Sequence, residues 1–496
     1  MEILISAVIG ELVTRSINFI INKIPRPTPM DVEDRLHKVL LRAQIILDEA
    51  MGRHITNQAM LLQLSIVRDA MYRGYYMLDT FSYQSRNEDK KDKVMTHLSS
   101  SSQVHSVNFS SRNTPILKQL QETLDDLTSL MLGVQEFVVF LTNYPRMSRQ
   151  PYNMHLQLAN CMFGRQMEAH LVINFLLHVQ PHSAEELEIL PIVGPSYVGK
   201  STLVAHVCKD ERVRAHFSEI LFFHFQGFKD EELATFKDEC ELKHQNRVSE
   251  SNLEGRLLVI IELIGDLNED AWNRLYSTSK RYAPRGSKII VTSRFDNIVK
   301  YGTTQALTLK FLSHEAYWYF FKTLTFGSMD PDMHPKLMRL AMEIAKVMGQ
   351  GQPRCHLGAN INAHLLKDNF DVQFWFEFLA FLRQSRHHQK LVSRFGEHPS
   401  DLPNQNIPIL FGRMSTLPED IMVYNRCQHP SEGDVPKIKF QDVLCGSVKS
   451  HGKFEVLAWR SRIPPYHSYT YTCEIGGPKT RLSKRKRSMK NGVVHF

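Results

Sequence analysis

The first 145 residues are organised by a helical repeat of apolar positions. Hydrophobic side chains recur at three- and four-residue steps within 1–24, 32–50, 60–78 and 117–141, which places them on one face of each segment. In the last segment the two step lengths alternate over about four heptads, as along a coiled-coil seam. The residues of that seam are Leu117, Leu120, Leu124, Leu127, Met131, Val134, Val138 and Leu141. The pattern predicts an N-terminal helical bundle or coiled coil, an interaction platform with no recognisable chemistry.

Charged residues interrupt the apolar face of segment 1–24. Glu2 stands where a signal peptide carries positive charge, and Glu11 and Arg15 break the apolar run. We therefore expect an amphipathic helix that packs against the other helices; the second interpretation is a helix whose apolar face contacts a membrane surface. Residues 84–113, rich in serine and charge, are expected to form a mobile loop.

Beyond residue 150 the pattern changes to short apolar strands that alternate with helices. The strands are expected at 189–193, 220–225, 257–263 and 288–292, and their alternation with helices predicts a parallel sheet with crossover helices. Residues 313–385 are helical in pattern and rich in aromatic residues. From residue 391, short apolar runs between Pro and Gly indicate a small β-rich module.

A phosphate-binding loop follows the first of these strands. Residues 194–201 read GPSYVGKS, which matches G-x-x-x-x-G-K-[ST] between an apolar strand and a helix-prone segment. Such a loop offers successive backbone N–H donors and a helix N-terminus to a polyphosphate. Lys200 is expected to bridge the β and γ phosphates, Ser201 to hold Mg²⁺, and Thr202 to reach the α phosphate. The candidate nucleotide-binding residues of the loop are Gly194, Ser196, Val198, Gly199, Lys200, Ser201 and Thr202.

Two further strand ends complete the candidate site. Residues 256–263, RLLVIIEL, take the place of a Walker B strand, whose acid holds the Mg²⁺ shell and polarises the attacking water. Ile261 replaces the first expected acid, so Glu262 is the candidate metal ligand and catalytic residue. Residues 286–294, GSKIIVTSR, place Arg294 at the carboxyl edge of the sheet, where it can contact the γ phosphate. The alternative is a solvated arginine at a strand end.

These patterns predict a multidomain α and α/β protein. The expected parts are a coiled-coil helical bundle at 1–145, a P-loop NTPase parallel α/β domain at 160–310, a helical subdomain at 311–390, a small β-rich C-terminal module at 391–475 and a basic tail at 476–496. We find no internal repeat of 20 to 50 residues and no leucine-rich consensus.

The order of the motifs resembles a plant disease-resistance protein of the coiled-coil NB-ARC class, with an Rx-like N-terminal domain. RDAMYRGYYMLDTF at 68–81 looks like the coiled-coil motif of that family, with Asp79 at its closing acidic position. FGRQMEAH, which starts at Phe163, resembles the linker over the adenine, and GQPR resembles the Gly-Leu-Pro-Leu motif. The resemblance therefore adds Gly164, Arg165 and Pro353 to the expected nucleotide-binding residues.

The resemblance implies a signalling switch in plant innate immunity that uses ADP or ATP with Mg²⁺. It also implies that the N-terminal bundle engages protein partners, self-association included. The winged-helix subdomain and leucine-rich repeats of the family are not recognisable. Because Ser196, Tyr197 and Ile261 depart from the family pattern, we expect at most a weak ATPase that uses Glu262. That weak ATPase and a degenerate scaffold that binds no nucleotide are the two alternatives to the switch.

Composition and charge add two constraints. The 496 residues are 43% hydrophobic and 23% charged, which excludes a wholly disordered or fibrous chain. The seven cysteines are scattered without a C-x-x-C, which favours a reducing compartment. Of the formal net charge of +8, seven positive charges lie within 479–490, so the remainder is only +1 and no direct nucleic-acid contact of the folded body is expected. We expect a cytoplasmic protein, whose basic tail acts as a nuclear-import signal, an anion-binding tail or a plain solvated end.

Overall fold

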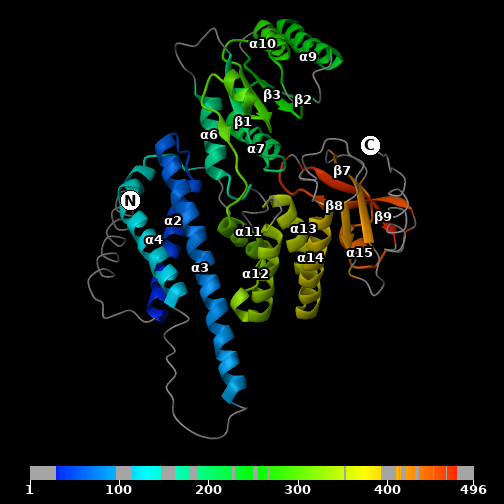
Figure 1. Ribbon diagram of the computed structural model, residues 1–496. Coiled ribbons are helices and arrows are strands. Elements are labelled where there is room, and N and C mark those ends of the chain that lie inside the picture. The colour runs from blue at the N-terminus through cyan, green and yellow to red at the C-terminus, as the bar shows by residue number, and fades with distance from the viewer. Residues whose placement is uncertain are drawn as a thin grey trace, which may run out of the picture. The chain divides into compact units, whose positions relative to one another are not determined.

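The computed structural model consists of two compact units (Figure 1). It describes residues 29–96, 114–146, 162–178, 187–225, 230–249, 255–265, 267–350, 354–392, 409–412, 414, 420–429, 435–448, 450, 452–464 and 466–476. The first unit is Met1–His182 with Leu312–Phe320, and the second is Ser183–Phe311 with Phe321–Phe496. The expected helix 1–24, Pro353 and the basic tail lie outside the described residues, and the domain boundaries stay predictions.

Three long helices form the core of the first unit: α2 (Pro29–Met51), α3 (Gln58–Thr96) and α4 (Thr114–Leu141). Their apolar stripes meet, so that Leu36, Leu64 and Leu124 are at most 2% exposed. The expected helical bundle is therefore confirmed. The expected loop is wrong for residues 84–96, because α3 continues to Thr96 through a charged stretch whose Glu and Lys residues are strong helix formers.

Aromatic side chains pack α3 against two other segments of the first unit. The Tyr72 ring lies 5.3 Å from the Phe163 ring and 5.1 Å from the Tyr319 ring. Trp318, in the first half of α11 (His314–Phe326), donates from Nε1 to Asp79 Oδ2 at 2.7 Å. The 68–81 motif thus forms a packed face of the bundle, and its closing acid has a buried partner.

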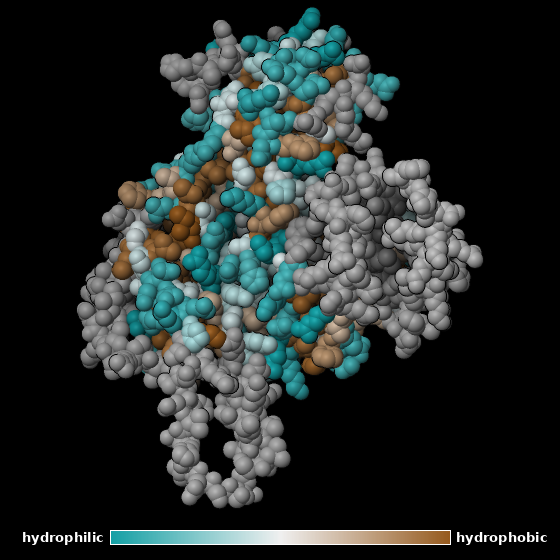
Figure 2. Space-filling model, in the orientation of Figure 1, coloured by the Kyte–Doolittle hydropathy of each residue, from teal (hydrophilic) through white to brown (hydrophobic). Residues whose placement is uncertain are grey.

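Apolar surface also remains on the outside of the bundle, which is partly brown in Figure 2. The exposed large apolar residues of its helices are Met30, Leu41, Ile45, Leu62, Ile66, Leu132, Val139 and Phe140. Nevertheless, none of the helices in the described ranges combines the length and apolar character that crossing a membrane requires.

The second unit begins with a five-stranded parallel sheet in the order β2-β3-β4-β1-β5. The strands are β1 (Glu188–Val193), β2 (Glu219–Phe225), β3 (Leu257–Leu263), β4 (Lys288–Ser293) and β5 (Leu307–Thr308). Strands β1, β3 and β4 are buried along nearly their whole length, as expected for a parallel sheet, and they therefore read as continuous apolar runs. The four strands expected from the sequence are confirmed.

The remaining helices precede, connect and follow these strands. They are α6 (Gln166–Leu177), which belongs to the first unit, and α7 (Lys200–Val207), α8 (Glu211–His216), α9 (Asp230–Ser249), α10 (Glu269–Tyr282) and the 3-10 helix η1 (Asp296–Tyr301) around the sheet. Beyond α11 come η2 (Pro331–Met333), α12 (Pro335–Gly349), α13 (His356–Asp368) and α14 (Val372–Val392), which form the expected helical segment.

The β-rich module is an antiparallel sheet in the order β6-β7-β9-β8. Its elements are β6 (Ile409–Gly412), β7 (Asp420–His429), α15 (Phe440–Leu444), β8 (Lys453–Arg460) and β9 (Ser468–Gly476). Val456 and Cys473 are fully buried in it, and Phe440 of α15 lies 5.1 Å from the Tyr471 ring. The expected fold class, helical, parallel α/β and small β in turn, is therefore confirmed.

Candidate functional site

The phosphate-binding loop joins the end of β1 to the start of α7. A Cβ atom on Gly194 would lie 2.4 Å from the Leu309 carbonyl oxygen, so only glycine fits where the chain leaves β1. Gly199 has φ 98°, a left-handed conformation that glycine adopts at no steric cost, and it directs the chain into α7. These two glycines shape a loop whose next residues enter a helix N-terminus, which is the arrangement that binds phosphate in other proteins.

Tyr197 is the unusual residue of this loop. Its φ is 61°, although tyrosine rarely adopts a positive φ, and its side chain is 46% exposed. The family glycine that the sequence lacks at this position would adopt this conformation without strain. The loop has therefore kept the backbone path that glycine favours while it presents an aromatic side chain.

Lys200, the first residue of α7, folds back over the loop. Its Nζ donates to the Gly194 carbonyl oxygen at 2.7 Å and to the Pro195 carbonyl oxygen at 3.0 Å. Burial lowers the pKa of Lys200 to about 8; the nearby Glu262 carboxylate opposes this shift, and the Arg294 charge adds to it. A lysine held in this way is ready to exchange carbonyl contacts for phosphate oxygens.

Ser201 and Glu262 meet although they belong to different elements. The Ser201 hydroxyl donates a short hydrogen bond to Glu262 Oε1, and His224 Nε2 lies 3.1 Å from Glu262 Oε2. Burial favours a raised Glu262 pKa, but the hydrogen bonds from His224 and Ser201 outweigh it and lower the pKa overall. The hydrogen bond between His224 and Glu262 raises the pKa of His224. Glu262 is therefore held as a carboxylate, with both oxygens engaged.

Arg294 lies where β4 ends, between β1 and β3 in the sheet. Its guanidinium carbon is 4.7 Å from the centre of the Phe295 ring, and its charge reaches Lys200. Its Nε is buried and has no hydrogen-bond partner among the described residues. A buried donor without a partner is costly, so this arginine is suited to an anionic ligand.

The oxygen donors at this edge fit a hydrated Mg²⁺ bound together with phosphates. Ser201 Oγ and Glu262 Oε1 are adjacent, and Mg²⁺ commonly takes only one or two protein oxygens beside phosphate and water. No cluster of three or more His, Cys, Asp or Glu side chains suited to a metal occurs within the ranges that the structure describes. The expected metal role of Ser201 and Glu262 thus stays a prediction that the geometry accommodates.

The predicted site residues are divided between the two units. The loop residues, Glu262 and Arg294 belong to the second unit, whereas Gly164 and Arg165 belong to the first. There the Gly164 carbonyl accepts from Arg68 Nη1 at 3.1 Å, and Arg165 Nη1 donates to Glu168 at 3.2 Å. The expected base-side role of these two residues stays untested, as does that of Pro353, which is not among the described residues.

His224 is the residue of this edge that the sequence analysis missed. It is the penultimate residue of β2, and Glu262 is the penultimate residue of β3; the two are register partners. A polar residue between the phenylalanines of FFHF, at the carboxyl end of a strand, was the available signal. Recognising its partner also required the order of the strands.

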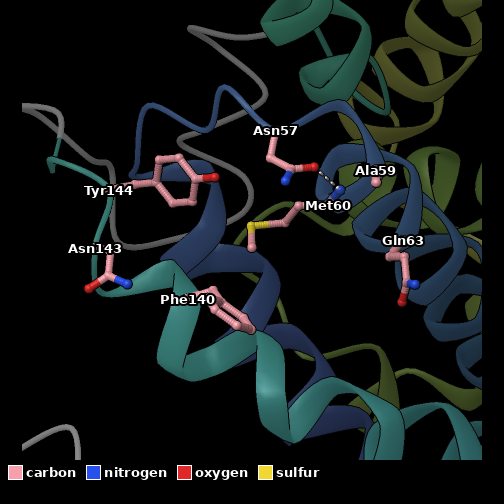
Figure 3. A pocket seen from close by; sticks show the side chains of 7 residues that line it. All are labelled: Asn57, Ala59, Met60, Gln63, Phe140, Asn143 and Tyr144. Carbon is pink, nitrogen blue, oxygen red and sulfur yellow. Dashed lines mark hydrogen bonds between the residues drawn. The ribbon is translucent and has the colours of Figure 1, made fainter.

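A hollow in the first unit offers a contrast to this edge. It has a volume of ≈ 300 Å³ and is lined by Asn57, Ala59, Met60, Gln63, Phe140, Asn143 and Tyr144 (Figure 3). Asn57 Oδ1 is occupied as a helix cap, since it accepts from the Met60 backbone N–H at 3.1 Å. The lining contains no charged group, so nothing in it would attract a polyphosphate.

Comparison with known proteins agrees with the motifs. Residues 169–330 match the NB-ARC domain family. The chain is 23% identical over 332 residues to "Disease resistance protein RGA2" of Solanum bulbocastanum, covering 64% of this chain and 33% of that protein. It is also 23% identical over 346 residues to "Putative disease resistance RPP13-like protein 1" of Arabidopsis thaliana, covering 63% of this chain and 31% of that protein. The expected similarity to NB-ARC disease resistance proteins is thereby confirmed.

The matches cover only part of each relative. The chain spans about a third of the length of the curated relatives it matches, and as little as 20% for "Putative disease resistance protein RGA1" of Solanum bulbocastanum, at 26% identity over 38% of this chain. Among solved structures, C. elegans PCH-2 matches with a TM-score of 0.26 and 13% identity, over 40% of this chain and 67% of that one. The matches support nucleotide binding and defence signalling at the level of the family.

Proposed function

We propose that this protein is an ADP- or ATP-binding switch in plant defence signalling. The nucleotide phosphates would bind at the N-terminus of α7, with Lys200 and Arg294 as their cationic partners and Ser201 with Glu262 as Mg²⁺ ligands. The observation that carries the proposal is the Ser201 to Glu262 hydrogen bond, which joins the phosphate loop to the end of β3. Two elements 61 residues apart in sequence thus meet where a metal-bound phosphate would lie.

Slow or absent hydrolysis fits the surroundings of Glu262 better than efficient turnover. A general base needs a pKa near the working pH, whereas the hydrogen bonds of His224 and Ser201 lower the Glu262 pKa. Ile261, at the position of the first family acid, is 1% exposed in the sheet core and supplies no carboxylate. We therefore place binding, rather than turnover, at the centre of the proposed function, with weak ATPase activity as the alternative.

The switch would act through the different affinities of two protein conformations for ADP and ATP. A nucleotide shifts a conformational equilibrium only if it binds one conformation more tightly than the other. Arg294 is suited to supply such a difference, because only ATP carries a γ phosphate for its partnerless Nε. The exposed apolar residues of the bundle, such as Ile45 and Leu62, would then contact partner proteins or a second copy.

Substitution of Lys200 tests the binding site directly. Lys200→Ala removes the cation of the loop and should weaken ADP binding at least tenfold, since a hydrogen bond to a charged group contributes about 1.5–3 kcal/mol. Lys280→Ala on the exposed face of α10 is the matched control and should bind ADP normally. Equilibrium dialysis against radiolabelled ADP, with circular dichroism as a folding check, measures both. Equal affinity of the Lys200 variant and the native protein would refute the loop assignment.

A further inference from the structure

The turn between β8 and β9 contacts the segment that directly follows α7, the helix that begins at the phosphate loop. Lys209, two residues beyond the end of α7, holds its Nζ 4.1 Å from the centre of the Tyr466 ring. This is the distance of a cation–π contact, in which an ammonium is attracted to the face of an aromatic ring. The β8–β9 turn therefore touches the segment just beyond the distal end of α7, whose first residue is Lys200.

Tyr466 makes this contact from a strained backbone. Its φ is 60°, and among the described non-glycine residues only Tyr197 shares a positive φ. The Tyr466 backbone N–H donates to the Ile463 carbonyl oxygen at 2.9 Å, which closes the turn. A non-glycine residue in this region costs of order 1 kcal/mol or more, and such residues cluster at ligand clamps and switches.

A tyrosine of β9 interacts electrostatically with groups at the phosphate loop. Burial, together with the neighbouring Tyr197, Cys355 and Glu262, raises the pKa of Tyr469 to about 12. Tyr197 is in the loop and Glu262 accepts from its serine, so the charge of the Tyr469 phenol interacts with groups at the phosphate loop. The observed contact of the module with this region is the one between the β8–β9 turn and Lys209.

The sheet is attached to the helical segment as well. The Trp459 ring of β8 lies 4.5 Å from the His364 ring of α13, and Gln441 Nε2 donates to the Ile361 carbonyl oxygen at 3.5 Å. The antiparallel sheet is consequently held on α13 while its β8–β9 turn reaches α7. It bridges two parts of the second unit that are far apart in sequence.

We propose that the antiparallel sheet acts as a clamp on α7 that slows the release of bound nucleotide. The Lys209–Tyr466 contact would attach the β8–β9 turn to the segment after this helix. The proposal rests on the proposed function, because it concerns the nucleotide at the same loop. The N-terminal turn of α7 would donate its backbone N–H groups to the phosphates, so release requires that this end of the helix loosen. A contact that restrains the segment directly after the opposite end of this eight-residue helix opposes that loosening. If the slower release corresponds to tighter binding, reciprocity of the coupling free energy requires that nucleotide also strengthen the docking of the sheet.

The test is the dissociation rate of a fluorescent ADP analogue from the full chain, chased with excess ADP. Tyr466→Asn removes the ring with a residue that tolerates the left-handed conformation, and Lys209→Met removes the cation. Each should accelerate release about two- to fivefold, the range that an exposed cation–π contact supports. Tyr466→Phe keeps the ring and should release the analogue at the native rate.

A matched control lies within the same sheet. Lys453 Nζ is also 4.1 Å from a tyrosine ring, that of Tyr424, but both residues belong to the sheet. Lys453→Met should therefore leave the dissociation rate unchanged. The double variant Lys209→Met/Tyr466→Asn should release the analogue no faster than the single variants do, because each alone already breaks the contact.

The outcomes separate this proposal from the proposed function. If the native protein binds no analogue, the proposed function fails, and the clamp fails with it. If the native protein binds the analogue but Tyr466→Asn releases it at the native rate, only the clamp is refuted. Equal acceleration by Lys453→Met would also refute it, because the effect would then come from the loss of positive charge. Hydrogen exchange provides a second readout: ADP should protect the β9 amides in the native protein and not in the Tyr466→Asn variant.

Discussion

The lowered pKa of Lys200 predicts that nucleotide affinity falls above pH 8. Burial places the pKa of Lys200 at about 8 when no nucleotide is bound, and the phosphate anions should raise it again on binding. Nucleotide therefore binds more tightly to the protein when Lys200 is protonated. The charged fraction falls from about 90% at pH 7 to about 9% at pH 9, so the dissociation constant should rise about tenfold over this range. A lysine with the ordinary pKa of 10.5 would give almost no change.

Isothermal titration calorimetry with ADP at pH 7, 8 and 9 measures this effect. Two buffers with different ionisation enthalpies at each pH report the protons taken up, which should approach one per ADP at pH 9. Lys200→Arg is the control, because an arginine stays charged throughout, so its profile should lack the tenfold change and keep only the contribution of other groups such as His224. A flat profile with no proton uptake in the native protein would refute the reasoning.

Two further predictions concern single buried contacts. Asp79→Ala removes the acceptor of the buried Trp318 N–H and should lower the free energy of unfolding by about 1–3 kcal/mol, measured by denaturant titration. Asp69→Ala is the control, because the Asp69 side chain is 58% exposed and its loss should have little effect. Equal losses in the two variants would contradict a stabilising role of the Asp79–Trp318 hydrogen bond. Ile261→Asp places a carboxylate at a position that is 1% exposed, so it should destabilise the protein by several kcal/mol without increasing phosphate release in a steady-state assay. A stable, faster-hydrolysing variant would show that this position faces the nucleotide.

The parallel sheet was predictable because its signal is local. Strands buried on both faces appear as continuous apolar runs, and β1, β3 and β4 are of this kind. The phosphate loop was equally visible, since its function requires Gly194, Gly199 and Lys200 at fixed spacing. The structure adds a steric reason for the first of these, namely the carbonyl oxygen of Leu309 beside Gly194.

Contacts that depend on tertiary placement were not predictable. The pairing of His224 with Glu262 follows from the register of β2 with β3. The approach of Tyr466 to Lys209 follows from the docking of a sheet whose strands carry no recognisable motif. The loop predicted for residues 84–96 was wrong for a different reason. Charged and polar residues fit both a solvated helix and a loop. Local composition alone cannot separate these two states.

The fate of bound nucleotide during purification tests the central claim most directly. The protein is purified natively, denatured, and its supernatant analysed for ADP and ATP by ion-exchange chromatography. We predict close to one nucleotide per chain for the native protein and almost none for Lys200→Ala. Native, folded protein that releases no nucleotide and binds none when ADP is added would contradict the switch and favour a scaffold whose helices alone make its contacts.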